Sequence, residues 1–269
     1  MLGSMNNDTL SGSVDGLRVQ NAAGVCTVTL ARPGSKNAFT SAMYERLADV
    51  LESLDSNGSR CLLIEAEGDS FCAGNDLNDF LTLDEFDDNT SVVRVLRALS
   101  AMECPVVAAV DGAAVGIGTT LLLHCDLVYA TPDARFAAPF VPLGLVPEAA
   151  SSRLLPELVG HRRAMAMFLL GEFLDAESAL AAGLVSHVVA QDTLSQAANA
   201  AATRVAALPA AAARATRRLC RMAPASVSAT VERELPVFAD CLQTAEARTA
   251  ITAVLNSISN RKTSHSKDS

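Results

Sequence analysis

The residue best suited to acid–base chemistry in this sequence is Glu148, the one carboxylate in a long apolar stretch. The stretch runs from Phe136 to Ala150 and includes the bulky side chain of Phe140. Burial among apolar neighbours disfavours a charged carboxylate and raises its pKa, as a general acid/base working near neutral pH requires. A structural interpretation competes with this one. Pro147-Glu148 stands at the mouth of an apolar helix, where an acid also stabilises the first turn.

A glycine-rich run at residues 111–118 lies between an apolar run at residues 106–110 and an apolar helix that continues to Leu123. Glycines that open a helix expose its first N–H groups at the positive end of the helix dipole, where negative charge is favoured. The spacing is not the G-x-G-x-x-G of dinucleotide sites, and the chain contains no G-x-x-x-x-G-K-[ST]. A nucleotide-phosphate site is therefore a weak interpretation.

The heptapeptide at residues 71–77 contains three small residues in a row, Cys72, Ala73 and Gly74. Small side chains let the backbone approach a ligand closely, so the N–H of Asn75 can point outward. One such N–H and one from the glycine-rich run would form a two-donor oxyanion hole. The alternative is a tight turn in which Asp76 caps a helix.

Polar residues also follow the apolar run at residues 25–30, as Arg32-Pro33 and then Lys36-Asn37-Ala38. They would lie at the carboxyl end of a strand, where open α/β sheets bind ligands. An ordinary Pro-Gly turn explains the same residues.

The elements that must position these groups alternate between strand and helix. Short β-branched runs predict strands at residues 25–30, 61–65, 106–110 and 126–130. Their nearly continuous apolarity is typical of a sheet covered on both faces. Apolar residues at helical spacing predict helices at residues 41–54 and 92–102. Together they indicate an α/β fold with right-handed crossovers.

From Glu148 onward the pattern is helical. It predicts helices at residues 149–158, 161–170, 176–182, 193–207, 211–222 and 227–257, with one short strand at 185–189. We expect a flexible N-terminal segment at 1–15, an α/β core at 16–205, a C-terminal helical segment at 206–258 and a flexible tail at 259–269.

Charge argues against a general nucleic-acid or membrane-surface binder. The chain has 21 Lys and Arg against 30 Asp and Glu, a net charge of −9, and Lys36 is the only lysine before Lys262. An anionic ligand would have to be held locally, by backbone N–H groups and a few arginines, because a basic field is missing.

Seven cysteines without a C-x-x-C pair indicate reduced thiols and a cytoplasmic location. Neither a secretory signal nor a membrane helix is expected.

Histidines do not suggest a metal centre. His161 and His187 have no ligand spacing, so we expect no metal. His124, on the apolar helix or at its end, is better interpreted as a core histidine with satisfied hydrogen bonds than as a catalyst.

In combination, the four stretches resemble the crotonase (enoyl-CoA hydratase/isomerase) superfamily, from about Val25 to Val189 by motif and onward by the helical tail. The resemblance implies a spiral of ββα units with a C-terminal helical segment, assembled as homotrimers or dimers of trimers. It implies that the enzyme stabilises a thioester enolate formed from an acyl-CoA substrate. Coenzyme A enters as part of that substrate, so no separate cofactor is implied.

The resemblance also implies roles for individual residues. The backbone N–H groups of Asn75 and Ile117 match the oxyanion hole, and Glu148 matches the acid/base. The positions implied to bind the substrate are Arg32, Lys36, Ala38, Ala73, Gly74, Asp76, Leu77, Gly116, Thr120 and Phe140.

Departures from the family's hydratase pattern point to one activity. Hydratases of this type carry two glutamates that hold and activate water, and these positions are Thr120 and Phe140 here. Glu148 falls where Δ3,Δ2-enoyl-CoA isomerases place their single acid/base. The resemblance therefore implies an isomerase of fatty acid β-oxidation that converts 3-enoyl-CoA to trans-2-enoyl-CoA.

Two alternatives stay open. One is a hydratase or another crotonase-type acyl-CoA enzyme that uses Glu148 with a water. The other is a non-catalytic scaffold or RNA-binding relative, and the acidic charge balance argues against RNA.

Overall fold

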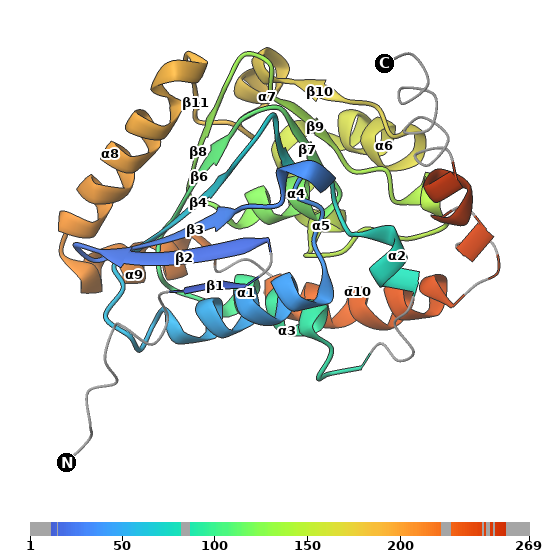
Figure 1. The fold of residues 1–269 in the computed structure, drawn as a ribbon, viewed down its shortest axis with the longest axis horizontal. Coiled ribbons are helices and arrows are strands. Elements are labelled where there is room, and N and C mark those ends of the chain that lie inside the picture. Colours follow the sequence, from blue (N-terminus) through green and yellow to red (C-terminus); the bar gives the residue numbers. More distant parts are fainter. Residues whose placement is uncertain are drawn as a thin grey trace.

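The computed structural model describes residues 12–14, 16–81, 87–221, 227–243, 245, 248–249 and 251–256. A seven-stranded sheet with the order β1-β2-β3-β4-β6-β8-β11 forms its centre (Figure 1). Strands β1 to β3 pair antiparallel, whereas β3, β4, β6, β8 and β11 pair in parallel. The bounds are β1 (Gly12–Val14), β2 (Leu17–Ala22), β3 (Val25–Leu30), β4 (Cys61–Ala66), β6 (Val106–Val110), β8 (Leu127–Ala130) and β11 (His187–Val188).

A second sheet has four strands in the order β10-β9-β7-β5. They are β5 (Ser70–Cys72), β7 (Ala113–Val115), β9 (Arg135–Ala137) and β10 (Leu174–Asp175). Along the chain, β5 follows β4, β7 follows β6 and β9 follows β8, and helices come after each pair. This repetition is the predicted spiral of ββα units, and the α/β fold class is confirmed.

Helices pack against both sheets and against one another. They are α1 (Ser41–Ser53), α2 (Leu77–Leu81), α3 (Ser91–Ala101), α4 (Ile117–Thr120), α5 (Ser151–Val159), α6 (His161–Leu170), α7 (Ala176–Ala182), α8 (Leu194–Ala207), α9 (Ala210–Arg221) and α10 (Val227–Leu242). Figure 1 shows α8 along the strands, away from α1, α3 and α10.

Both faces of the large sheet are buried, as its apolar strands predicted. In β4, Leu62 and Ile64 join the main core with α1 and α3, while Cys61 and Leu63 face α8. The α8 residues packed there include Ala198 and Ala202, and several further alanines lie on this helix. Small side chains let a helix lie close to the sheet, so the alanine-rich sequence has a packing function.

Element bounds differ from expectation in a few places. The helix predicted at residues 227–257 is wrong only as one unbroken helix, because α10 ends at Leu242 and Gln243 is a turn, while the described residues 245, 248–249 and 251–256 are helical again. The helix predicted to reach Leu123 is also wrong, since α4 ends at Thr120 and a 3₁₀ turn follows at Leu121–His124. Three leucines at residues 121–123 continue the apolar run through this second break, so periodicity could not mark it.

At the ends of the chain, Gly12–Val14 forms an exposed strand within the segment 1–15 that was expected to be flexible. Residues 1–11 and 15, and the tail predicted at 259–269, lie outside the described residues. Among the described residues, no helix combines the length and apolarity that a membrane crossing requires.

Candidate active site

The two predicted oxyanion donors lie on adjacent segments because two parallel strands end at the same edge of the small sheet. Strand β5 leads into Asn75, and β7, its parallel neighbour, leads into Ile117. A Cβ added to Gly116 would lie 3.7 Å from the Cα of Gly74, so the two backbones are in contact. Gly74 and Gly116 have φ of +98° and +57°, which side chains rarely permit.

Both N–H groups are available to a ligand. Within the described residues, the N–H of Asn75 and the N–H of Ile117 donate no hydrogen bond. Ile117 begins α4, and the first N–H groups of a helix have no intrahelical acceptor. Two free backbone donors side by side are the arrangement that stabilises a developing oxyanion.

The predicted acid lies beside this pair and is buried. Glu148 is 5% exposed, in the loop before α5. The hydroxyl of Thr120 donates to its Oε1 at 2.5 Å. Thr120 lies one helical turn after Ile117 in α4, so one short helix carries both a predicted oxyanion donor and the group that holds the carboxylate. Thr120 was predicted to line the site, and its contact is with Glu148.

The turn that carries Glu148 has an unusual backbone. The next two residues, Ala149 and Ala150, have φ of +52° and +57° although neither is glycine. The carbonyl of Glu148 accepts hydrogen bonds from the N–H of Ser151 at 2.8 Å and from its hydroxyl at 2.6 Å. The carbonyl of Ala149 is 2.8 Å from Nε2 of His124. Strained conformations of this kind persist only where neighbours enforce them.

Tyr44 is a site residue that the sequence did not reveal. Its hydroxyl donates to Oδ1 of Asn75 at 2.5 Å, from the buried face of α1. Burial raises the pKa of Tyr44 well above its usual value of 10, and the nearby negative charge of Glu148 raises it further. The phenol therefore stays protonated and acts as a donor. No local sequence pattern marks this tyrosine of α1 as a functional residue.

The predicted substrate-binding residues Arg32 and Asp76 form an ion pair. Nη1 of Arg32 is 2.8 Å from Oδ2 of Asp76 and 3.1 Å from the carbonyl oxygen of Ala38. Burial acts to raise the pKa of Asp76, but hydrogen bonds from Arg32 and from backbone N–H groups lower it overall. One of those N–H groups, from Asn78, is 3.2 Å away at the start of α2, beside Leu77. Asp76 thus also has the capping role considered from the sequence.

The buried amide of Asn37 ties the neighbouring loop to the oxyanion segment. Its Nδ2 donates to the carbonyls of Glu67 and Ser70, each at 2.8 Å. The N–H of Ala73 in turn donates to the carbonyl of Lys36 at 2.9 Å. The structure therefore brings the stretch at residues 32–38 and the heptapeptide at 71–77 together, with the Lys36 side chain exposed at their surface.

Comparison with known proteins places this architecture in a family. Residues 20–260 match the family model described as enoyl-CoA hydratase/isomerase. This chain belongs to that family.

Relatives and a solved structure agree. The 1,2-epoxyphenylacetyl-CoA isomerase of Escherichia coli (strain K12) is 40% identical over 195 residues, which cover 69% of this chain and 74% of the relative. Enoyl-CoA delta isomerase 2 of Rattus norvegicus is 35% identical over 184 residues, covering 66% of this chain and 47% of that protein. The crystal structure of an enoyl-CoA hydratase/isomerase from Pseudoalteromonas atlantica T6c superposes with a TM-score of 0.83 at 42% identity, covering 90% of this chain and 97% of the other.

Family membership makes this protein a crotonase-type enzyme, and Phe140 is a predicted site residue that the structure buries. Phe140 is 6% exposed, and its ring centroid is 6.2 Å from that of Phe168 in α6. Its carbonyl accepts from the N–H of Leu145 at 2.9 Å, which shapes the loop leading to Glu148. An apolar ring occupies the position where the resemblance places a second hydratase glutamate.

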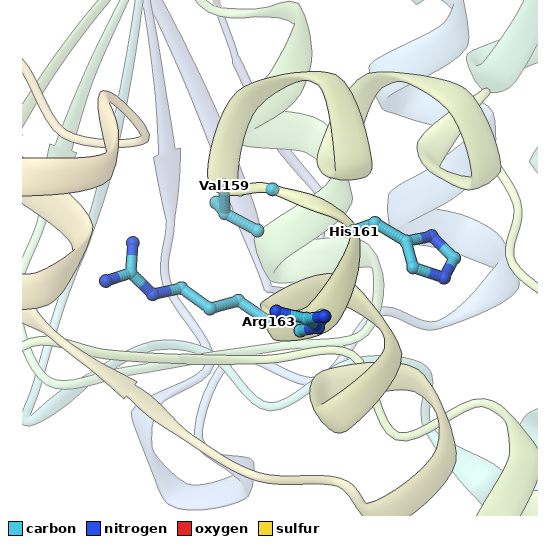
Figure 2. A pocket seen from close by; sticks show the side chains of 5 residues that line it. Val159, His161 and Arg163 are labelled. Carbon is cyan, nitrogen blue, oxygen red and sulfur yellow. The ribbon is translucent and has the colours of Figure 1, made fainter.

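An open hollow of about 480 Å³ lies apart from the predicted residues of this enoyl-CoA hydratase/isomerase. Val159, Gly160, His161, Arg162 and Arg163 line it at the junction of α5 and α6. Figure 2 shows the His161 ring pointing away from Val159. The hollow contains none of the predicted site residues. Within the described part of the chain, no group of three or more His, Cys, Asp or Glu side chains is arranged to hold a metal ion.

Proposed function

We propose that this enzyme is a Δ3,Δ2-enoyl-CoA isomerase in which Glu148 is the only acid/base. One observation carries the proposal: a buried carboxylate is held by Thr120, whose helix begins with the free N–H of Ile117. Among the side chains that the structure describes, Glu148 is the one buried carboxylate. A double-bond shift needs one group that takes a proton and returns it, so a single carboxylate suffices.

In the proposed reaction, Glu148 removes a proton from C2 of a 3-enoyl-CoA thioester. The electron pair moves onto the thioester oxygen and forms a dienolate, which the N–H groups of Asn75 and Ile117 stabilise. The same carboxyl then returns the proton to C4, and the double bond comes to lie between C2 and C3. Atoms and charge balance without a redox step, so the proposal needs no cofactor beyond the CoA of the substrate. Losing one oxyanion donor costs about 3–4 kcal/mol of transition-state stabilisation in other enzymes.

Hydration is the second candidate, favoured by the name of the Pseudoalteromonas protein, an enoyl-CoA hydratase/isomerase. Against it, the two positions implied for hydratase glutamates are Thr120 and Phe140. The hydroxyl of Thr120 holds Glu148, and Phe140 packs against Phe168. Neither side chain can act as a base toward water. Rearrangement of an epoxide, as the name of the Escherichia coli relative describes, is a further crotonase-type activity to test.

The decisive experiment compares trans-3-hexenoyl-CoA with crotonyl-CoA as substrates and identifies the products by chromatography. We expect trans-2-hexenoyl-CoA from the first and little 3-hydroxybutyryl-CoA from the second. Glu148→Gln should lower isomerase turnover at least about 100-fold, as loss of an acid/base group does. Glu157→Gln is the matched control, because that glutamate lies on the surface of α5 with its side chain 58% exposed.

Two results would contradict the proposal. Glu148→Gln turnover above about a tenth of wild type would place the base elsewhere. Efficient hydration of crotonyl-CoA with no isomerisation of the hexenoyl thioester would make the enzyme a hydratase. Adding 1,2-epoxyphenylacetyl-CoA as a third substrate in the same assay tests for rearrangement of an epoxide.

We also propose that the protein assembles as a homotrimer or as a dimer of trimers. Exposed apolar side chains gather at the end of α6 and just beyond it, where Leu169, Leu170 and Phe173 are 47%, 69% and 55% exposed. Apolar side chains grouped on a surface mark sites of association. Light scattering should give a mass three or six times that of the chain, and Leu170→Glu should reduce it. A wild-type monomer at micromolar concentration would contradict this assembly.

We also propose that this enzyme acts in fatty acid β-oxidation and is cytoplasmic, and the cysteines support the proposed location. Six described cysteines are free thiols. Burial raises the pKa of Cys72 and of Cys125 to about 12, so these thiols stay protonated and unreactive. Free thiols suit a reducing compartment. Fluorescence microscopy of the tagged protein should show cytoplasmic signal, and enrichment in a membrane fraction would contradict it.

A further inference from the structure

We propose that His124 is a positioning residue, which holds the turn that carries Glu148 by donating a hydrogen bond from Nε2 to the carbonyl of Ala149. The inference rests on the proposed acid/base role of Glu148. It does not depend on which acyl-CoA the enzyme converts.

The geometry shows why this turn needs a support. Ala149, directly after Glu148, has a φ of +52°, and Ala150 follows with +57°. Residues with a Cβ rarely adopt this left-handed region, and two in succession are less common still. A backbone of this kind keeps its conformation only where surrounding contacts enforce it. The 2.8 Å contact from Nε2 of His124 fixes the carbonyl between the two residues.

The chemistry of the contact determines which tautomer His124 adopts. A backbone carbonyl only accepts hydrogen bonds, so Nε2 must carry the proton. His124 is fully buried, and burial together with the positive charge of Arg221 lowers its pKa from 6.5 to about 3. The ring is therefore neutral at physiological pH and keeps its donor on Nε2. A neutral, immobile donor suits positioning better than proton transfer.

The backbone of His124 is itself anchored by helix α9. Its carbonyl accepts from Nη2 of Arg217 at 2.8 Å and from Nη2 of Arg221 at 2.9 Å, both in α9. Arg217 also pairs with Asp126, its Nε lying 2.7 Å from Oδ2. A chain of contacts thus runs from α9 through His124 to the turn beside Glu148. Helix α9 therefore supports the turn beside Glu148 through the backbone of His124.

The test compares two substitutions of equal length. His124→Gln keeps an N–H near the place of Nε2, whereas His124→Met fills the same space without a donor. We expect kcat for trans-3-hexenoyl-CoA to fall about 100-fold in His124→Met, since a displacement of about 1 Å can cost that much. KM should change less than about threefold, because the CoA-binding segments are not touched. His124→Gln should recover kcat to within about fivefold of wild type. His161→Met, at an exposed histidine, is the control.

The outcomes separate the two proposals. If Glu148→Gln is inactive while His124→Met retains wild-type kcat, the positioning role is refuted and the proposed function stands. If Glu148→Gln stays active, the proposed acid/base role of Glu148 is refuted, and the positioning role of His124 that rests on it is refuted with it. Equal losses of kcat in folded His124→Gln and His124→Met would also refute the role of the N–H. If His124→Met does not fold, the test rests on folded His124→Gln. A kcat of His124→Gln near that of wild type supports the proposal, and a loss of more than tenfold overturns it.

Discussion

Acidification should destabilise this protein specifically through His124. In the folded protein its pKa is about 3, against 6.5 for an ordinary histidine, because burial and the charge of Arg221 disfavour the protonated ring. The unfolded chain therefore binds a proton at His124 between these two pH values, and the folded chain does not. The stability that this difference contributes is fully present above pH 6.5 and is lost as the pH falls toward 3.

The size of the effect follows from linkage. Between the folded and unfolded pKa values, each pH unit changes the free energy of unfolding by about 1.4 kcal/mol. Lowering the pH from 7 to 5 spans 1.5 units below the unfolded pKa and should remove about 2 kcal/mol of unfolding free energy through this residue. His124 is fully buried, so solvent screening does not reduce the figure. A loss of this size is a large part of the stability of an ordinary domain.

The assay is urea unfolding followed by circular dichroism at both pH values, for wild type and for His124→Gln. The variant keeps a donor for Ala149 but does not titrate, and every other ionisable group is common to both proteins. We expect the wild-type free energy of unfolding to fall by about 2 kcal/mol more than that of the variant between pH 7 and pH 5. Identical falls would refute the assignment of a buried, neutral His124.

Three further changes have expected outcomes. Tyr44→Phe removes the hydroxyl donor beside the oxyanion pair, so isomerase kcat should fall about tenfold, as loss of about 1.4 kcal/mol does; unchanged kcat would show that this donor is dispensable. Gly112→Ala would place a Cβ 2.0 Å from a backbone oxygen at a φ of +67°, so it should cost about 4 kcal/mol or more in thermal unfolding. Gly58 is the control, because it also has a positive φ but an added Cβ there would meet no atom within 4 Å. Gly58→Ala should therefore lower the unfolding free energy by only about 1–2 kcal/mol, and similar losses for the two variants would contradict the steric argument. Arg217→Met should lower the unfolding free energy by about 3 kcal/mol, because its buried guanidinium serves several acceptors; denaturant titration measures this, and a loss under about 1 kcal/mol would mean that α9 contributes little.

Much of the fold could be predicted from periodicity alone. The strands at residues 25–30 and 106–110 and the helices at 161–170 and 176–182 have the bounds that the sequence predicted. Strands β5, β7 and β9 were not predicted, since three residues are too few to show alternation. These short strands align Asn75 with Ile117.

The residue types of the proposed catalytic centre are determined by the sequence itself. Glu148 is the sole carboxylate of its apolar stretch, and glycines at 74 and 116 allow the backbone conformations of the oxyanion pair. Such features are local, because a side chain's chemistry and a glycine's conformational freedom belong to one position in the chain.

Only the tertiary structure decided which groups support these residues. Tyr44 carries no local mark of function, yet it donates to Asn75. His124 was interpreted as a core histidine, and the structure places its Nε2 against the carbonyl of Ala149. Thr120 is separated from Glu148 by a strand pair and a loop. These partners meet through packing of elements distant in sequence, and periodicity carries no information about which side chains face one another there.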